Sequence, residues 1–483
     1  MEQEVPNYVK SVQAQGVYGR FDIEHEFQPG VNILFGKNGS GKTTLLHILA
    51  NILNGNYELF SFLTFDSIQV KLDDSSEVTL HRSGNAIQVQ RTDFPTIEFL
   101  AQDAEEYILR KEYGRRDKIE ALQLSLFDNE FEKFKEIEPP MQAAYFPAFR
   151  SMIEAWTTVQ QEDRLPRHTR ELDATDLYRL ERIALVHGRQ RATLLARQLF
   201  GQFVPSITYP SPLEIEVRLT EEFRKAVSTI GLTNQELFSG AFLDIFAVLS
   251  KESNQIGEQP EKILEEILSL FGKLDASSLG TVSMVDTAYY ARLRSRIETL
   301  MSYRSKNLED IAVGILDIYR KSLEKRANVQ ENSFEGLRRY LQAVNEFLEG
   351  KNLYIRQKTT DPLTASIQIK FDDGSSSSLR ALSSGERQII TMIYVASQMS
   401  AQKIVLIDEP EISLHVDWQR LLLKKMSEQL RDRQVIACTH SPVIGADYED
   451  RLMELRLKPT TKVSQEDLSI TSSKEGNEEE ELF

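Results

Sequence analysis

The stretch "GKNGSGKTTLL", Gly36 to Leu46, decides the fold of this chain. It contains the pattern GxxxxGK[ST], preceded by the strand-like run "VNILF" and followed by the helix-like run "TTLLHILANIL". In this context, successive backbone N–H groups and a helix N-terminus surround phosphates, the lysine reaches the outer phosphates and the hydroxyl ligates Mg²⁺. The stretch predicts a phosphate-binding loop, with Thr43 as the Mg²⁺ ligand. The nucleotide-binding residues are then Gly36, Lys37, Asn38, Gly39, Ser40, Gly41, Lys42, Thr43 and Thr44.

Two apolar runs near the C-terminus each end in polar residues. "KIVLIDEP" predicts a central parallel strand with Asp408 and Glu409 at its carboxyl end, where such sheets bind ligands. Asp408 would hold Mg²⁺ through water, and Glu409 would polarise the attacking water. "QVIACTHSP" predicts a neighbouring strand that ends in His440, where the imidazole can sense the γ-phosphate. An acid or a histidine at a strand end also has an ordinary structural explanation, so the order of the motifs carries the weight.

A second anion site is predicted in "ALSSGERQ", Ala381 to Gln388. Ser383 and Glu386 form a capping box, which places Ser384 and Gly385 in the first turn of a helix, where backbone N–H groups are free. Two phosphate cradles in one chain make sense if the second contacts the γ-phosphate bound by another subunit. Taken alone, the octapeptide also fits an ordinary capped surface helix.

Composition limits the class of protein. The chain has 483 residues, 41% of them hydrophobic, which predicts a folded protein with more than one domain. Its net charge of −16 argues against coating of nucleic acid and restricts any contact with DNA to a local surface. The single cysteine, Cys438, and the lack of a signal peptide or apolar span predict a cytoplasmic protein without a membrane segment.

Periodicity divides the chain into four parts. We expect residues 1–101 to form an N-terminal, β-rich lobe that carries the phosphate-binding loop, and residues 102–350 to form a mainly helical insert with a core strand near 143–149. Residues 351–460 form a C-terminal lobe with the remaining motifs. Residues 461–483 form an acidic tail with too little apolar content to fold alone.

Two features of the insert predict its internal structure. Thr233 and Glu236 form a capping box, which predicts that a helix begins there. The apolar positions of residues 263–274 stop before several heptads build up, which argues against a long coiled-coil arm.

Together these motifs resemble the ABC-type ATPase heads of the RecF, SMC and OLD group. "GKNGSGKTT" resembles Walker A, "LSSGERQ" the signature motif, "KIVLIDEP" Walker B with its catalytic Glu409, "EISLH" the D-loop region and "THSP" the switch-histidine region of His440. The resemblance covers residues 9–94 and 352–443. It implies an α/β ABC-ATPase head with a large helical insertion, and ATP and Mg²⁺ as cofactors.

Within that group, "DEPEISLH", "THSP" and "YFPAFR" look most like the stand-alone ATPase subunits of bacterial antiphage systems, AriA-like in PARIS or PtuA-like in Septu. The resemblance implies a homo-oligomer, a dimer or higher, that encloses ATP between the Walker A loop of one chain and Ser384 and Gly385 of the next. It also points to Gln142 or Arg150 as the Gln-loop contact, and to Tyr18 or Arg20 beside the adenine.

The resemblance further implies a nucleotide-gated sensor or scaffold that holds or releases a separate effector protein, such as a nuclease. The acids of "ADYEDR" have no strand context for a nuclease metal site of this chain's own. A second interpretation is a RecF-like DNA-repair ATPase, with DNA bound by the arginine-rich stretches at residues 164–197 and 289–306. The interleaved acids of those stretches favour solvated helix faces instead. Two further interpretations are weaker: the long insert and "EISLH" argue against a transporter's nucleotide-binding subunit, and Glu409 argues against a non-hydrolysing scaffold.

Overall fold

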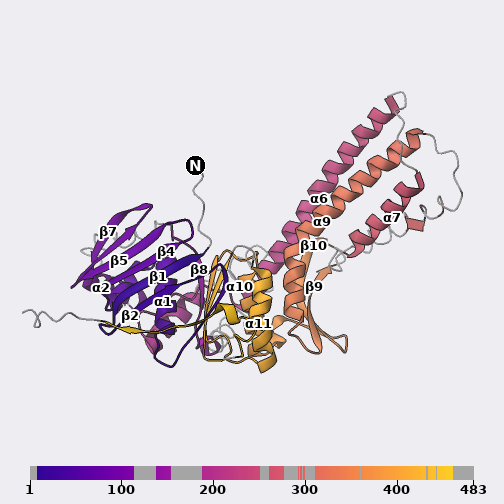
Figure 1. Ribbon diagram of the computed structural model, residues 1–483. Coiled ribbons are helices and arrows are strands. Elements are labelled where there is room, and N and C mark those ends of the chain that lie inside the picture. Colours follow the sequence, from indigo (N-terminus) through magenta and orange to yellow (C-terminus); the bar gives the residue numbers. More distant parts are fainter. Residues whose placement is uncertain are drawn as a thin grey trace, which may run out of the picture.

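The computed structural model shows a head built on three β-sheets, from which a pair of long helices projects (Figure 1). It describes residues 8–113, 138–153, 188–250, 260–276, 310–358, 361–430, 433–441 and 443–460, with residues 292, 294, 295, 297 and 299. The predicted acidic tail, residues 461–483, lies outside these described residues.

The first sheet is antiparallel and comes mainly from the N-terminal hundred residues. Its strand order is β15-β2-β1-β4-β5-β6-β7. The strands are β1 (Val9–Val17), β2 (Phe21–Glu26), β4 (Ser67–Leu72), β5 (Glu77–Ser83), β6 (Ala86–Arg91), β7 (Phe94–Leu100) and β15 (Lys458–Pro459). The alternating runs in the sequence predicted β1, β2, β4, β5 and β6, and the structure confirms these strands. They did not predict β7, where Pro95 is tolerated because β7 is an edge strand.

The second sheet is parallel throughout and forms the centre of the head, with the order β14-β3-β13-β12-β8. The strands are β14 (Leu452–Glu454), β3 (Gly30–Phe35), β13 (Gln434–Thr439), β12 (Ile404–Asp408) and β8 (Ala143–Phe146). The predicted core strand near residues 143–149 is β8. The strand before the phosphate-binding loop, β3, belongs to this parallel sheet although it precedes most of the antiparallel strands.

The two faces of the parallel sheet contribute to two different hydrophobic cores. Ile404 and Leu406 of β12 pack into one core with α1 (Lys42–Leu53) and the antiparallel sheet. Val405 and Ile407 face the other core, which contains the helices of the C-terminal part. This alternation follows from the period of two in a strand. Because β12 is buried on both faces, its sequence is a continuous apolar run rather than an alternating one.

The remaining elements surround these sheets. The third sheet is antiparallel and has the order β11-β10-β9. Its strands are β9 (Lys351–Lys358), β10 (Asp361–Phe371) and β11 (Ser376–Ser377). Besides α1, the head contains the helices α2 (Ala101–Tyr113), α10 (Ser384–Ala396) and α11 (Val416–Gln429), and the short 3₁₀ helices η1 (Tyr57–Phe62), η4 (Leu379–Ala381) and η5 (Glu449–Arg451).

The insert contains a long helical arm. In Figure 1, α6 (Pro212–Ser250) and α9 (Asp310–Asn345) run side by side away from the head, and α7 (Pro260–Ala276) lies beside α9. With 39 residues, α6 is about 58 Å long at the usual rise per residue. The expectation of no long arm was therefore wrong. The seam is built from two segments that are distant in sequence, with Phe223 of α6 stacked on Phe334 of α9, so no single stretch shows it.

The predicted helix start at Thr233 was also wrong, because Thr233 and Glu236 lie inside α6. The helix begins earlier, at a better start signal. Ser211 Oγ accepts a hydrogen bond from the backbone N–H of Glu214, and Pro212 occupies the first helical position, where its missing N–H costs nothing. A capping-box pattern inside a helix has no free N–H groups to cap.

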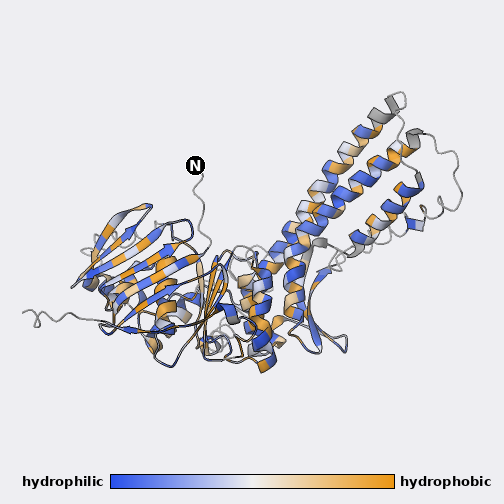
Figure 2. Ribbon diagram, viewed as in Figure 1, coloured by the Kyte–Doolittle hydropathy of each residue, from blue (hydrophilic) through white to orange (hydrophobic). Residues whose placement is uncertain are grey.

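Hydropathy follows this architecture. Figure 2 shows hydrophobic and hydrophilic residues alternating along the antiparallel strands and along the arm helices. In the outer arm, Ile263, Ile267 and Phe271 of α7 pack with Val313 and Leu323 of α9 in a core of their own. The fold is therefore α/β, a parallel-sheet core with a β-rich lobe and a large helical insertion.

One buried side chain joins the parallel sheet to the antiparallel sheet and gives a stability prediction. Gln434 has no exposed surface; its Oε1 accepts from the backbone N–H of Val9 (3.0 Å), and its Nε2 donates to the carbonyls of Val9 (3.1 Å) and Gln28 (3.0 Å). We expect Gln434→Leu to lower the free energy of unfolding by about 1–3 kcal/mol for each buried group left without a partner. Urea denaturation measures this, with Gln13→Leu on the exposed face of β1 as the control. Equal stability of the two variants would contradict the prediction.

Candidate nucleotide site

The phosphate-binding loop connects β3 to α1 and depends on glycine. Gly39 and Gly41 have φ angles of 80° and 81°, in the left-handed region that favours glycine. Gly41 is also the N-cap of α1, and no side chain caps it. The first turn of α1 therefore presents backbone N–H groups and the positive end of the helix dipole to an anion.

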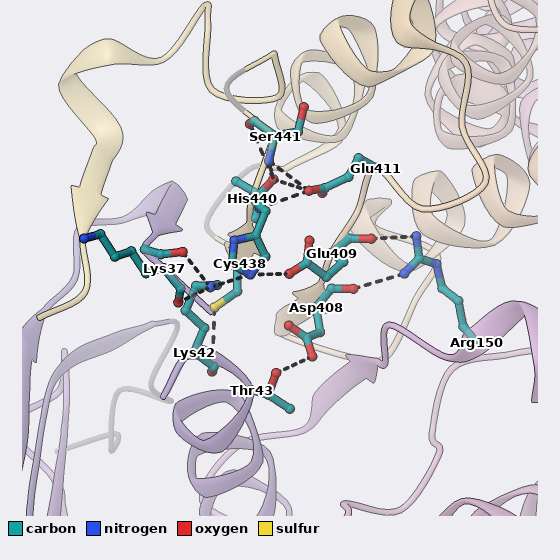
Figure 3. Close-up of polar contacts among 12 residues, drawn as sticks. Lys37, Lys42, Thr43, Arg150, Asp408, Glu409, Glu411, Cys438, His440 and Ser441 are labelled. Carbon is teal, nitrogen blue, oxygen red and sulfur yellow. Dashed lines mark hydrogen bonds and ion pairs between the residues drawn. The ribbon is translucent and has the colours of Figure 1, made fainter. Parts of the chain in front are cut away.

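Lys42, the first residue of α1, crosses its own loop. Its Nζ donates to the carbonyls of Gly36 (2.9 Å) and Lys37 (3.3 Å) and lies 2.8 Å from His440 Nε2. The side chain is nearly buried, which keeps its charge at the centre of the loop. Figure 3 shows Lys42 between the loop and the end of β13. The Lys42 ammonium can therefore meet the outer phosphates of a nucleotide.

Asp408 ends β12 next to the loop. It is almost fully buried, and its Oδ2 accepts a hydrogen bond from Thr43 Oγ1 at 2.8 Å. Its Oδ1 is buried and makes no hydrogen bond, and burial raises the pKa of the carboxyl. An oxygen without a partner beside a hydroxyl fits Mg²⁺, which prefers oxygen ligands and usually keeps several waters.

Glu409 follows directly, in a strained backbone conformation with φ of 49°. Its Oε1 lies 3.1 Å from His440 Nε2, so the histidine is near both Glu409 and Lys42. Burial, together with the neighbouring carboxyls of Glu411 and Asp408, raises the pKa of Glu409 to about 8. A carboxylate with a pKa near the working pH is suited to accept a proton from water.

Glu411 holds the histidine loop, a role that no pattern in the sequence indicates. Its Oε1 accepts from Thr439 Oγ1 (2.7 Å) and from the backbone N–H groups of His440 (3.0 Å) and Ser441 (3.0 Å). One carboxylate oxygen therefore fixes the end of β13 relative to the end of β12 (Figure 3). The sequence places an acid in the D-loop region but does not reveal which backbone groups it accepts from.

The second predicted anion site has the predicted capping box. Ser383 Oγ accepts from the backbone N–H of Glu386, and Glu386 Oε2 accepts from the backbone N–H of Ser383 at 2.8 Å. Glu386 also pairs with Lys351 of β9 at 2.9 Å. Ser384 is exposed, whereas Gly385 is buried against the D-loop: a Cβ on Gly385 would lie 2.8 Å from the carbonyl of Ser413. Gly385 is thus required for packing inside its own chain.

The interpretations of Gln142 and Arg150 as the Gln-loop contact were wrong. Gln142 precedes β8, at the amino edge of the parallel sheet and opposite the end of β12 that carries Asp408. Arg150 is buried and points at the backbone of Asp408 and Glu409 from the side away from the loop (Figure 3). The resemblance could not show which way these side chains point.

Tyr18 and Arg20, expected beside the adenine, are both exposed. The ring of Tyr18 lies 6.0 Å from that of Phe21, and Phe21 Cε2 lies 3.6 Å from where a Cβ on Gly41 would be. Tyr18 is therefore close to the phosphate-binding loop, and its contact with adenine remains a prediction.

The described part of the chain holds neither a membrane-spanning helix nor a metal cluster of its own. None of its helices combines the length and apolarity that crossing a membrane requires. No group of three or more His, Cys, Asp or Glu side chains in the same described residues is arranged to hold a metal. A magnesium ion at Asp408 and Thr43 would therefore share its ligands with water and nucleotide.

Comparisons with known proteins agree with an ATPase. Residues 229–447 match the family described as "AAA domain, putative AbiEii toxin, Type IV TA system". This range contains the signature motif, Asp408, Glu409 and His440. The energy-coupling factor transporter ATP-binding protein EcfA1 of Thermotoga maritima is 47% identical over 51 residues, which is 10% of this chain and 20% of that protein.

Similar solved structures are heads of Smc proteins. One is the Smc head domain with an extended coiled coil bound to the C-terminal domain of ScpA, from Pyrococcus furiosus, with 14% identity, 96% of this chain and 98% of that chain covered, and a TM-score of 0.37. Another is the Smc head bound to the C-winged helix domain of ScpA, with 11% identity, 94% and 97% covered, and a TM-score of 0.38. The family match over residues 229–447, together with the convergence of Lys42, Asp408, Glu409 and His440, supports an ATPase.

The geometry of Lys42 gives a direct binding prediction. We expect Lys42→Ala to abolish ATP binding, because it removes the charged contact with the outer phosphates. Isothermal titration calorimetry with ATP and Mg²⁺ measures this, and Lys10→Ala, an exposed lysine on β1, is the control. Unchanged ATP affinity in a folded Lys42→Ala protein would contradict the assignment of the loop.

Proposed function

We propose that this chain binds and hydrolyses ATP as a homo-oligomer, and that its nucleotide state holds or releases a separate effector protein in antiphage defence. One observation carries the proposal. The hydrolytic groups converge at one edge of the parallel sheet, whereas the exposed Ser384 begins a helix that packs on the D-loop. One chain thus presents two anion sites, and an ATP shared between two chains uses both.

Each residue of the first site has a role in the proposal. Lys42 binds the outer phosphates, and the backbone from Gly36 to Thr44 surrounds them. Thr43 and Asp408 would hold Mg²⁺, which neutralises phosphate charge when it is bound. Glu409 accepts the proton of the attacking water, and His440 contacts the γ-phosphate. Glu411 keeps His440 in place through the backbone.

The second site is arranged to act in trans. Ser383 and Glu386 cap each other, and the exposed Ser384 in the first turn would present its backbone N–H to an anion from outside the chain. Glu386 is also paired with Lys351, so contacts within the chain itself hold this start of α10 in place.

Two observations support a partner protein as the target of the nucleotide state. A toxin–antitoxin system, named in the matching family description, has by definition a second component. The outer half of α6 also exposes large apolar side chains, Leu232, Phe238 and Leu243, of the kind that protein interfaces cover. The effector, a nuclease or another enzyme, would then be a separate polypeptide.

The RecF-like alternative requires arginines that can reach DNA phosphates. Of the arginines in the predicted stretches, Arg197 is paired within the chain with Glu112 and Arg189 with Glu214 at 3.7 Å, whereas Arg292 is exposed. This pairing agrees with acids interleaved among arginines on helix faces. The predicted arginines of residues 164–187 and those at 296 and 304 lie outside the described residues.

If Glu409 is the base, its substitution should affect the rate of ATP hydrolysis but not the affinity for ATP. We expect Glu409→Gln to keep ATP affinity and to slow hydrolysis by roughly 10²–10⁴-fold, the usual effect of a lost general base. Phosphate release under saturating ATP measures this, with the exposed Glu349→Gln as the control. Turnover equal to that of wild type would show that Glu409 is not the base.

A mixing experiment tests whether the sites are shared between chains. Ser384→Arg should leave ATP binding intact but block hydrolysis, because a bulky cation would obstruct the neighbour's γ-phosphate. Lys42→Ala alone should also be inactive. A mixed oligomer retains one composite site with wild-type groups on both sides, so hydrolysis should partly recover when the two variants are combined.

The exposed Ser239→Arg on α6 is the matched control, since it adds the same charge away from the head, and it should behave as wild type. No recovery in verified mixed oligomers would argue against shared sites. Full activity of Ser384→Arg alone would show that the start of α10 does not contact ATP.

A further inference from the structure

Arg150 is a buried arginine whose partners are mostly backbone carbonyls. Its side chain is 2% exposed, and it lies four residues after the end of β8. A guanidinium has five N–H donors in a fixed planar arrangement. In Arg150, the Nε–H points at a side chain of α10 and the terminal N–H groups point at backbone carbonyls. Its Nε donates to Gln388 Oε1 at 3.1 Å. Its terminal nitrogens donate to the carbonyls of Pro147 (3.2 Å), Asp408 (3.0 Å), Glu409 (3.0 Å), Pro410 (3.1 Å) and Ile412 (3.2 Å).

Four of the carbonyls that accept hydrogen bonds from Arg150 belong to the strained segment from Asp408 to Ser413. Glu409 and Ser413 have φ angles of 49° and 67°, which side chains other than glycine rarely adopt. Such conformations persist only where the surrounding structure holds them. Arg150 bonds to four of the five carbonyls from Asp408 to Ile412, and therefore holds the turn that directs the Glu409 side chain toward His440 (Figure 3).

The same cluster reaches the helix that carries the second anion site. Gln388 of α10 is buried, accepts from Arg150, and donates through Nε2 to Ser151 Oγ at 2.7 Å. Ser151 Oγ in turn lies 3.0 Å from Ser413 Oγ. Because Gly385 packs directly on the carbonyl of Ser413, α10 and the strained turn touch at both of these places.

We propose that Arg150 is a positioning residue that couples the start of α10 to the placement of Glu409. When α10 contacts the ATP of a neighbouring chain, a shift of Gln388 passes through the guanidinium to the carbonyls around Glu409 of the same chain. ATP bound at one composite site thereby changes the position of the Glu409 carboxylate at the other composite site. The inference rests on the proposed function, since it concerns ATP hydrolysis at shared sites.

The test separates turnover from binding. In Arg150→Lys, an ammonium cannot reproduce the planar fork, so kcat for ATP should fall by roughly 10²-fold, as expected for a misplaced catalytic group, while ATP affinity stays unchanged. Gln388→Leu, which keeps the guanidinium but removes its link to α10, should lower kcat and abolish cooperativity in ATP. Gln388→Glu retains the acceptor for Arg150 and replaces the Nε2 donor with an oxygen that can accept from the Ser151 hydroxyl, so both kcat and cooperativity should stay close to those of wild type.

Arg433→Lys is the matched control. Arg433 also donates to backbone carbonyls, those of Ser397, Gln398 and Ser400, but it lies at the amino end of β13, away from the site. It should lower the melting temperature without changing kcat. A role for Arg150 in stability alone predicts that both arginine variants behave alike, and that outcome would overturn the inference.

The outcomes also separate the inference from the function on which it rests. If wild-type protein hydrolyses ATP but the Arg150 and Gln388 variants keep its kcat, only the inference fails. If wild-type protein binds ATP and shows no hydrolysis under any condition that forms oligomers, the proposed function fails and the inference fails with it. Should Arg150→Lys not fold, the comparison of Gln388→Leu with Gln388→Glu decides, because both keep the guanidinium.

Discussion

The parallel register of three strands is the constraint on which the site depends. In the sheet, Phe35 of β3 pairs with Thr439 of β13, and Cys438 of β13 pairs with Asp408 of β12. The loop after β3, the acids after β12 and the histidine after β13 therefore emerge at one edge, although they come from distant parts of the sequence. A shift of one residue in either pairing would move Asp408 away from Thr43 and exchange the side chains that face the two cores.

Burial on both faces fixes that register. One face of the sheet packs on α1 and the antiparallel sheet, and the other on the helices of the C-terminal part and the base of the arm. Each large aliphatic side chain buried there contributes about 1.5–3 kcal/mol relative to exposure. This packing offsets the polar groups gathered at the edge, where Asp408 Oδ1 and Glu411 Oε2 are buried without hydrogen bonds and Glu409 keeps a strained backbone. This part of the cost lies at the place where a nucleotide and Mg²⁺ would bind.

The sequence predicted what depends on local pattern. Apolar runs and glycine spacing located β3, β12, β13 and the phosphate-binding loop, and the pair Ser383 and Glu386 predicted the start of α10. Contacts between distant segments were not predictable. Nothing in "YFPAFR" shows that Arg150 turns toward the backbone around Glu409, and nothing in "DEPEISLH" shows that Glu411 accepts from the loop of His440. The arm was missed for the same reason, since the packing partner of α6 begins about sixty residues after α6 ends.

Two contacts that do not involve Arg150 join the base of the arm to α10. Tyr340 of α9 is fully buried and donates its hydroxyl proton to the carbonyl of Ile390 on α10 at 3.1 Å. Six residues after α9 ends, Lys351 pairs with Glu386, the residue that caps the same helix. A rotation of α9 must therefore carry α10 with it or break a buried hydrogen bond and a partly buried ion pair, and breaking them is the costlier course. Whatever binds the arm can act on α10 from outside, while Gln388 and Arg150 connect α10 to the hydrolytic edge inside the head. The helix α10 thus contacts both the base of the arm and the turn that bears Glu409.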